Sequence, residues 1–338
     1  MPSLFAGPSG RETSKVRRLF LQRAAALTAS IGAAPFVFGQ ADWPSRPIRL
    51  LVPYPPGGAI DPVARALGAR LPSMLGQPLV IENRPGANTA IAAGAVSKAD
   101  PDGYTLLISS TTTHAIHTIQ SPRGYDAVTG FTQVAALSRG DYMMAINAAV
   151  PANSLPEFIA WGRANPDRVS AGVSGTGNAD HLAAELFKLI TGVRLTSVPY
   201  KGSAAALLDL VAGRVQMMIT TQSLLQPQVD AGKLRMMALT NQPAGKPQVP
   251  LFSQFGLKDL EMFGLVTILL APPNLPSPVL GKLTSAVQRT LETPETMAAI
   301  AAVNQSPFYL PPQALRDRLV NDGAKLAEII QKADIRFE

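Results

Sequence analysis

IRLLVPYPPGGAIDP, residues 48–62, is the stretch that decides the fold. Its first five residues are apolar and β-favouring apart from Arg49, and the prolines and glycines that follow can continue neither a strand nor a helix. Asp61 and Pro62 form a good helix start, because an aspartate side chain can cap free amides and proline suits the first helical position. The stretch therefore predicts a strand, a glycine-rich loop and a helix in direct succession.

The same order of elements continues along the first part of the chain. The helix that starts at Asp61 has apolar residues at every fourth position, and Pro72 is expected to break or kink it before Gly76. Further strands are expected over residues 79–82 and 104–109, with an alanine-rich helix between them. Alternating strands and helices favour a mostly parallel sheet covered by helices.

The pattern restarts further on and predicts a second α/β lobe. Strands are expected over residues 169–173, 195–200, 215–220 and 234–240, and helices over residues 156–164, 180–191 and 203–212. Helices are also expected over residues 278–291 and 312–332. The predicted domains are residues 42–140 with 255–338 as the first lobe and residues 141–254 as the second.

Composition limits the classes of function. The 338 residues are 46% hydrophobic and 16% charged, which fits an ordinary globular protein of two domains. Four of the seven net positive charges precede residue 42, and no cluster of basic and aromatic residues follows, which argues against nucleic-acid binding. The absence of cysteine excludes disulfides, thiolate metal sites and a lipid anchor on an N-terminal cysteine.

Residues 1–41 resemble an export signal. Residues 11–23 are basic, residues 24–38 are apolar or small, and small residues recur at 39–41, which is the order of a signal peptide. The apolar stretch is too short for a stable transmembrane helix, so a retained anchor is the weaker interpretation. Arg17-Arg18 resembles a twin-arginine signal, and both export routes remain open. The mature chain is expected to be free in the periplasm.

Two glycine-rich loops lie between a predicted strand and a predicted helix, where open α/β sheets bind ligands. The first contains Gly57, Gly58, Ala59, Ile60 and Asp61, and the second contains Ser174, Gly175, Thr176, Gly177 and Asn178. Each is followed by helix amides that can hold a carboxylate without a basic side chain. Either loop taken singly is equally an ordinary tight turn, but two in matching positions favour a cleft.

Other chemistry receives little support. The second loop has only two of the three glycines of a dinucleotide fingerprint, and no serine-centred elbow surrounds Ser174. His114 and His117 lack a third metal ligand at suitable spacing, so neither a metal nor a cofactor is expected. His181 is either a capping residue or a ligand contact. The threonines at 111–113 are either pocket donors or a polar loop.

Short motifs are spread over the whole mature length. The first half contains WPSRPIR at 43–49, PPGGAID at 55–61, GQP at 76–78, ENRPG at 82–86 and PDGYTLL at 101–107. The second half contains ANP at 164–166, GTG at 175–177, HL at 181–182, VPYKG at 198–202, AGKLR at 231–235 and AP at 271–272. In order and spacing, the chain resembles the solute-binding proteins of tripartite tricarboxylate transport, the Bug family.

This resemblance implies a two-lobed, type II-like periplasmic binding protein that closes around a small carboxylate and presents it to a membrane permease. Members of the family hold the carboxylate with the two loops, largely through backbone amides and ordered water, without metal or cofactor. Position by position, this points to Gly57, Gly58, Ala59, Ile60, Asp61, Ser174, Gly175, Thr176, Gly177, Asn178 and His181, with Thr111, Thr112 and Thr113 lining the cleft.

The sequence departs from the family pattern where selectivity is expected. Residues 266–268 are Val-Thr-Ile where the family usually has Trp-x-Gly, and Thr220-Thr221 stand where an aspartate usually follows the preceding strand. Thr220 is therefore a further candidate ligand contact. The expected ligand is a dicarboxylate, an aromatic carboxylate or a nitrogen-bearing carboxylate, bound by a monomer. A hydrolase-like enzyme and a ligand-sensing module that binds a partner protein are the alternatives.

Overall fold

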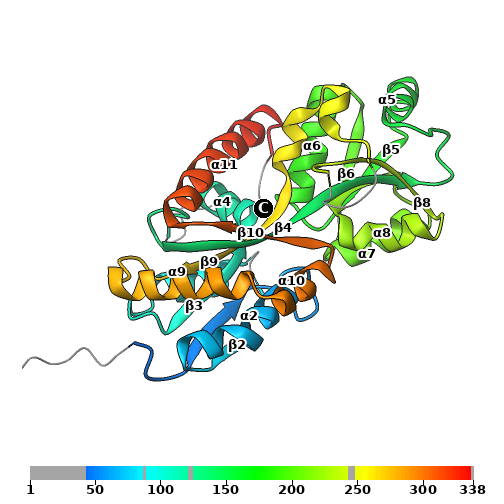
Figure 1. Ribbon diagram of the computed structural model, residues 1–338. Helices are drawn as coiled ribbons and strands as arrows, with labels where there is room; N and C mark the ends of the chain where they lie inside the picture. Colours follow the sequence, from blue (N-terminus) through cyan, green and yellow to red (C-terminus); the bar gives the residue numbers. More distant parts are fainter. Residues whose placement is uncertain (1–42, 87–88, 121–124, 243–247, 336–338) are drawn as a thin grey trace, which may run out of the picture. The chain divides into compact units, whose positions relative to one another are not determined.

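The computed structural model describes residues 43–86, 89–120, 125–242 and 248–335, so the predicted export signal lies outside the described residues (Figure 1). In chain order the elements are β1 (Ile48–Val52), α2 (Asp61–Leu75), β2 (Leu79–Asn83), α3 (Ala90–Ser97), β3 (Thr105–Ser110), α4 (Thr111–Gln120), β4 (Thr132–Asn147), α5 (Leu155–Ala164), β5 (Val169–Val173), α6 (Ala179–Thr191), β6 (Leu195–Pro199), α7 (Ser203–Val211), β7 (Met217–Thr221), α8 (Gln222–Asp230), β8 (Leu234–Leu239), the 3-10 helices η2 (Phe252–Phe255) and η3 (Lys258–Met262), β9 (Gly264–Ala271), α9 (Ser277–Leu291), α10 (Pro294–Ala301), β10 (Gln305–Leu310) and α11 (Pro312–Lys332).

Helix α2 differs from its prediction at Pro72. The helix continues past this proline to Leu75, and Gly76 then closes it in the left-handed conformation, with its amide donating to the Pro72 carbonyl at 2.8 Å. A proline inside a helix removes one backbone hydrogen bond. Leu71 and Leu75 are nevertheless buried, and the packing of this face holds the last turn in place. The helix is therefore not broken at Pro72, and the alternative of a kink there stays a prediction.

The strands form one hydrogen-bonded network in the order β2-β1-β3-β9-β4-β7-β5-β6, and β8 and β10 also pair with β4. Strands β2, β1 and β3 are mutually parallel, and so are β6, β5 and β7. Strand β4 pairs in the antiparallel direction with β7, β8, β9 and β10. Strand β9 is also antiparallel to β3. The predicted parallel pairing is thus found among β1, β2 and β3 and among β5, β6 and β7, whereas the pairs formed by β4 and β9 are antiparallel.

Two sheet regions can be defined by their partners along β4. The first sheet region comprises β1, β2, β3, β9, β10 and the first part of β4, which pairs with β9 from Thr132 to Asp141. The second sheet region comprises β5 to β8 and the last part of β4, which pairs with β7 from Tyr142 to Ile146. The change of partner falls beside Gly140, where an added Cβ would lie 3.0 Å from Cγ of Gln305.

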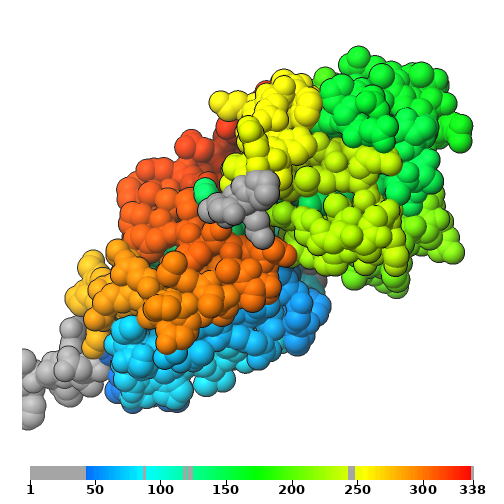
Figure 2. Space-filling model, turned by 45° about the vertical axis from the view of Figure 1, so that its right-hand side comes forward, coloured from blue at the N-terminus to red at the C-terminus, as the bar shows by residue number. Residues whose placement is uncertain are grey.

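Segments distant in sequence cover the same strands. Helices α9 and α10 pack against α2, and α11 packs against α4 (Figure 1). Figure 2 shows α9 and α10, in orange, lying directly on the blue and cyan N-terminal elements. Each region has its own buried core, which includes Leu51, Leu107 and Ile268 in the first and Met143 and Met218 in the second. None of the helices in the described residues has the length and hydrophobicity that a membrane span requires.

Candidate functional site

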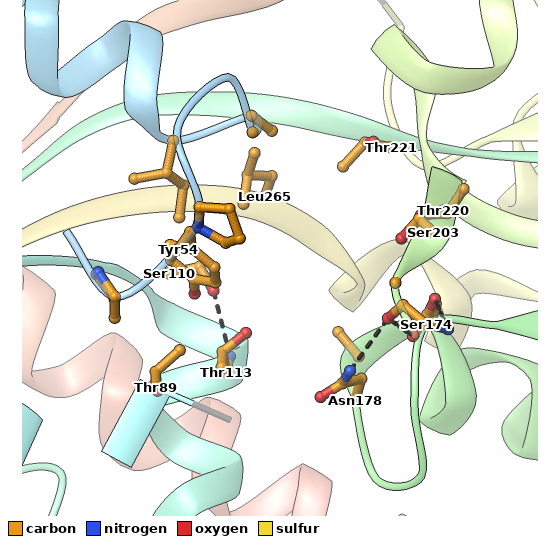
Figure 3. Close-up of a pocket in the computed structure, with 18 of the residues that line it drawn as sticks. Tyr54, Thr89, Ser110, Thr113, Ser174, Asn178, Ser203, Thr220, Thr221 and Leu265 are labelled. Carbon is orange, nitrogen blue, oxygen red and sulfur yellow. Dashed lines mark hydrogen bonds between the residues drawn. The ribbon is translucent and has the colours of Figure 1, made fainter. Parts of the chain in front are cut away.

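A cavity of about 350 Å³ lies where the parallel strands of both sheet regions end (Figure 3). From the first region it is lined by Pro53, Tyr54, Pro55, Gly58, Ala59, Ile60, Pro85, Gly86, Thr89, Ser110, Thr113 and Leu265, and β4 contributes Tyr142. From the second region it is lined by Ser174, Asn178, Ala179, Asp180, Gly202, Ser203, Thr220 and Thr221. This is the end of an open α/β sheet at which ligands bind.

Several helices begin at this cavity. The lining residues Ile60, Thr89, Ser110, Gly202 and Thr221 directly precede α2, α3, α4, α7 and α8, and Ala179 is the first residue of α6. The first turn of a helix has unpaired amides and carries a partial positive charge. Among the described lining residues there is no lysine or arginine. The cavity can therefore attract an anion through amides and hydroxyls rather than through basic side chains.

Asp61 holds the first loop from beneath. Its Oδ2 accepts the Gly57 amide at 3.1 Å and Arg65 Nε at 2.8 Å, and its Oδ1 accepts Asn83 Nδ2 at 3.0 Å. Burial alone would raise the pKa of the Asp61 carboxyl, but the hydrogen bonds from Arg65, Asn83 and Gly57 outweigh burial and lower this pKa. Asp61 stays ionised and fixes the shape of the loop.

The predicted residues of the first loop divide into two groups. Gly58, Ala59 and Ile60 line the cavity, whereas Gly57 and Asp61 bond to each other and do not line it. The amides of Gly58, Ala59 and Ile60 meet no acceptor among the described residues. These three amides are the donors that the loop offers to a bound anion.

Gln305 of β10 fixes the orientation of this loop from a distant part of the sequence. Its Nε2 donates to the Ala59 carbonyl at 2.6 Å, and its Oε1 accepts the Ser138 hydroxyl at 2.7 Å. The carbonyl and amide of a trans peptide point in opposite directions. Because the Ala59 carbonyl points toward Gln305, which does not line the cavity, the Ile60 amide points away from Gln305.

We expect Gln305→Ala to loosen the first loop without unfolding the protein. Loss of its two hydrogen bonds, to the Ala59 carbonyl and the Ser138 hydroxyl, should speed the exchange of the hydrogen-bonded Gly57 and Ala64 amides at the two ends of the loop about tenfold, measured by hydrogen exchange and mass spectrometry in the absence of any ligand. Gln313→Ala is the matched control, because Gln313 Nε2 bonds only to the exposed Asp317. Unchanged exchange in the Gln305 variant would show that Gln305 does not position the loop.

The second loop is held by Asp180, which is not among the site residues predicted from the sequence. Oδ2 of Asp180 accepts the Ser174 amide at 2.7 Å and Oδ1 accepts the Ser174 hydroxyl at 2.8 Å. Asn178 Nδ2 donates to Ser174 Oγ at 3.1 Å. Burial raises the pKa of the Asp180 carboxyl, although its hydrogen bonds act in the opposite direction. Ser174 and Asn178 line the cavity, whereas Gly175, Thr176 and Gly177 do not.

His181 acts inside the second loop rather than at the cavity wall. Its Nδ1 accepts the Gly177 amide at 2.9 Å, and its Nε2 lies 3.7 Å from Oε1 of Glu185. His181 is not among the lining residues. The hydrogen bond to Gly177 fits the hydrogen-bonding role, and contact of His181 with a ligand stays a prediction.

The three predicted threonines lie in a helix rather than in a loop. Helix α4 begins at Thr111, so the alternative of a polar loop is wrong. Thr113 lines the cavity and its amide donates to Ser110 Oγ at 3.3 Å, whereas Thr111 and Thr112 are buried away from it. Strand β3 passes directly into α4, and no glycine or proline marks this transition in the sequence.

Two hydroxyls in the cavity wall have no partner among the described residues. These are the buried oxygens of Tyr54 and Thr89, and Thr89 is only 4% exposed. A buried hydroxyl without a hydrogen bond is costly, so each is suited to a ligand or a water molecule. Figure 3 shows Tyr54 and Thr113 on one side of the cavity, across from Ser174, Thr220 and Thr221.

Only some of the positions predicted to determine selectivity line the cavity. Thr220, which was predicted to contact the ligand, lines the cavity together with its neighbour Thr221. Val266, Thr267 and Ile268 are buried in β9 and do not line it, but Leu265 does. Ser203 begins a helix just after a strand, as the two glycine-rich loops do, so the sequence could have predicted it as a cavity residue. No local sequence pattern indicates that Tyr142 or Leu265 lines the cavity.

Catalytic and metal chemistry gain no support at this site. The Ser174 hydroxyl donates to Asp180 rather than to a histidine. The His114 ring is buried, with Nε2 3.0 Å from the Ala127 carbonyl and its edge against Phe131. Within the described residues, no group of three or more histidine, aspartate or glutamate side chains is placed to hold a metal.

Comparison with known proteins identifies relatives over most of the chain. Residues 63–335 match the model of the TctC family, described as the tripartite tricarboxylate transporter family receptor. The solved periplasmic binding protein BugD is 28% identical, with a TM-score of 0.75, over 88% of this chain and 100% of BugD.

Two similar solved structures contain carboxylates. A protein of R. palustris, solved with adipate, is 32% identical with a TM-score of 0.77, over 87% of this chain and 99% of that protein. MatC from Rhodopseudomonas palustris, solved with bound malate, is 28% identical with a TM-score of 0.72, over 85% of this chain and 100% of MatC.

Proposed function

Since the chain belongs to the TctC family of tripartite tricarboxylate transporter receptors, we propose that it captures a small carboxylate in the periplasm and delivers it to a membrane permease of this transporter type. The family consists of binding proteins rather than enzymes, and the fold is that of the periplasmic binding proteins. Two relatives hold adipate and malate, which are both small carboxylates.

One observation carries the proposal for the site. Unpaired amides and hydroxyls of the first sheet region and the N-termini of helices from both regions converge on one cavity, and no described lysine or arginine lines it. In this proposal the carboxylate binds to the amides of Gly58, Ala59 and Ile60, with hydroxyls such as those of Ser110 and Thr113 beside it. Asp61 and Gln305 are then positioning residues for these amides.

The predicted lobes supply the mechanism of capture. If residues 42–140 with 255–338 form one lobe and residues 141–254 the other, the two loops close on the ligand from opposite lobes. The chain passes between these lobes along β4, close to Gly140. A ligand that touches both loops favours the closed state by its differential affinity, and opening releases it to the permease.

Export is the remaining part of the proposal. The basic and apolar segments of residues 1–41 are a suitable signal, and BugD is a periplasmic relative. A fusion of residues 1–45 to a reporter that is active only after export tests this part directly. Replacing Arg17 and Arg18 with lysine in the fusion separates the twin-arginine route from ordinary secretion.

We expect some small carboxylates to raise the thermal unfolding midpoint of the mature protein. Binding only to the native state stabilises it by about 2.7 kcal/mol when the ligand is at one hundred times its Kd. A panel of mono-, di- and aromatic carboxylates should therefore include members that raise the midpoint by several degrees, and mass spectrometry of gently purified protein should detect a released carboxylate. No response across the panel, together with release of a compound without a carboxylate, would overturn the proposal.

A further inference from the structure

Asp180 differs from Asp61 in lacking a counter-charge. Each aspartate lies in the first turn of a helix that begins at the cavity and accepts an amide of its own loop. Asp61 also pairs with Arg65, with Nε 2.8 Å from Oδ2. Asp180 is 3% exposed, accepts hydrogen bonds from Ser174 and from the His181 amide, and forms no ion pair with any residue that the structure describes.

The groups around Asp180 do not neutralise it. His181 accepts a hydrogen bond at Nδ1 from Gly177, so this nitrogen carries no proton, and its other nitrogen faces Glu185. Tyr142 lines the same cavity, and burial and the Asp180 charge both raise the pKa of its phenol, so the phenol stays neutral. Asp180 is also the only acidic residue among the described lining residues.

The cavity is therefore chemically asymmetric. The side formed by the first sheet region offers the amides of Gly58 to Ile60 and the unpartnered hydroxyl of Thr89, and no carboxyl group. The side formed by the second sheet region contains Asp180. The Ser174 amide and hydroxyl and the His181 amide donate to its carboxyl, and a carboxylate can accept a further hydrogen bond from a donor on a ligand.

We infer that the ligand is a carboxylate whose other end carries a hydrogen-bond donor, an ammonium or a hydroxyl group, and that Asp180 selects against a second carboxylate. The inference rests on the proposed capture of a carboxylate and names its substrate class. A donor at the Asp180 side forms a charge-assisted hydrogen bond, whereas a second carboxylate there meets a buried like charge. The N-termini of α6, α7 and α8 also lie on this side and repel an ammonium, but each carries only a partial positive charge, which is smaller than the full negative charge of the Asp180 carboxylate.

The test uses acids of equal length that differ only in their far end. Adipate, 6-aminohexanoate, 6-hydroxyhexanoate and hexanoate form the six-carbon set, and the corresponding five- and four-carbon sets cover the length of the cavity. We expect calorimetric titration to give a donor-bearing acid a Kd about tenfold or more below that of the dicarboxylate of the same length. The ammonium and hydroxyl members separate the two donor classes.

Asp180→Asn removes the charge with little change in shape. We expect it to reduce this preference to about threefold or less, because a neutral amide no longer repels a second carboxylate. Asp61→Asn is the matched control, since it removes a carboxylate from the same position of the other loop, and it should weaken all acids of a set together. Thermal unfolding of both variants without ligand verifies that they fold, and Asp180→Ser replaces the asparagine variant if that variant does not.

The outcomes separate the inference from the proposed function. A dicarboxylate that binds the wild-type protein as tightly as its donor-bearing counterpart, with the same ratio in the Asp180 variant, overturns the inference and leaves carboxylate capture intact. A ligand released from the purified protein that has two carboxylates and no donor group does the same. If no acid of any set binds and the released compound has no carboxylate, the proposed function fails first.

Discussion

Asp61→Ala is expected to lower the free energy of unfolding by about 2–3 kcal/mol and to reduce carboxylate affinity at least about tenfold. The substitution leaves Asn83 Nδ2 and the Gly57 amide without their shared acceptor beneath the first loop. Breaking a fully buried ion pair would destabilise the protein more than this. The Arg65 side chain is 56% exposed and can turn to solvent, so the loss of its ion pair contributes little to the change in stability. Urea unfolding and calorimetric titration measure the two effects.

The exposed pair of Glu328 and Lys332 provides the control for Asp61. It has the same spacing along a helix, and its side chains are 60% and 65% exposed. Glu328→Ala should change neither stability nor affinity measurably, because solvent already screens this pair. If both alanine variants behaved alike, Asp61 would be an ordinary surface partner of Arg65 and not the support of the first loop.

The sign of the pH dependence follows from the lowered pKa of Asp61. A carboxyl whose pKa is lower in the folded state stabilises the protein above its unfolded pKa, here near 3.8, and loses this effect as the pH falls through the folded value. The difference in stability between wild type and Asp61→Ala should therefore be full at pH 6 and shrink below pH 4. A difference that stayed constant down to pH 2 would contradict the ionised state assigned to Asp61.

The parts of the site that were predicted from sequence are those encoded locally. A strand that ends in prolines and glycines and passes into a helix is visible within fifteen residues, and Gly58 to Ile60 and Ser174, which this pattern indicated, line the cavity. The same local rule cannot decide which loop residues face inward. Gly57 and Gly177 have their amides bonded to Asp61 and His181, and only side-chain positions in three dimensions reveal this.

The parts that were missed depend on long-range pairing. No element was predicted for β4, because its sixteen residues place Ser138, Arg139 and Asp141 in the middle of an otherwise apolar run. Those polar residues lie near the change of partner from β9 to β7, which no local pattern encodes. Tyr142 and Leu265 line the cavity only because of this crossing, and Gln305 reaches Ala59 across 246 positions of sequence.

Glu185 connects the stability of the second sheet region to the second loop. Its Oε1 accepts the Ser197 hydroxyl at 2.7 Å, and Lys188 Nζ lies 3.3 Å from Oε2. The same Oε1 faces Nε2 of His181, whose other nitrogen accepts the Gly177 amide. Burial alone would raise the pKa of the Glu185 carboxyl, but His181, Ser197 and Lys188 outweigh burial and lower it to about 2.

We expect Glu185→Gln to lower the free energy of unfolding by about 2–3 kcal/mol at pH 7 and by almost nothing near pH 2. The folded pKa of about 2 lies below the ordinary value of 4.5, so the charge stabilises the fold above pH 4.5 and this effect disappears as the pH falls through 2. Urea unfolding from pH 2 to pH 7 should therefore give curves that converge at the acid end. The control is Glu295→Gln, whose carboxyl is 59% exposed and pairs only at the surface with Arg70, and its curve should follow that of the wild type throughout. Parallel curves for Glu185→Gln and wild type would mean that the carboxylate is not what holds His181, and the link from α6 to the Gly177 amide would then have to rest on packing alone.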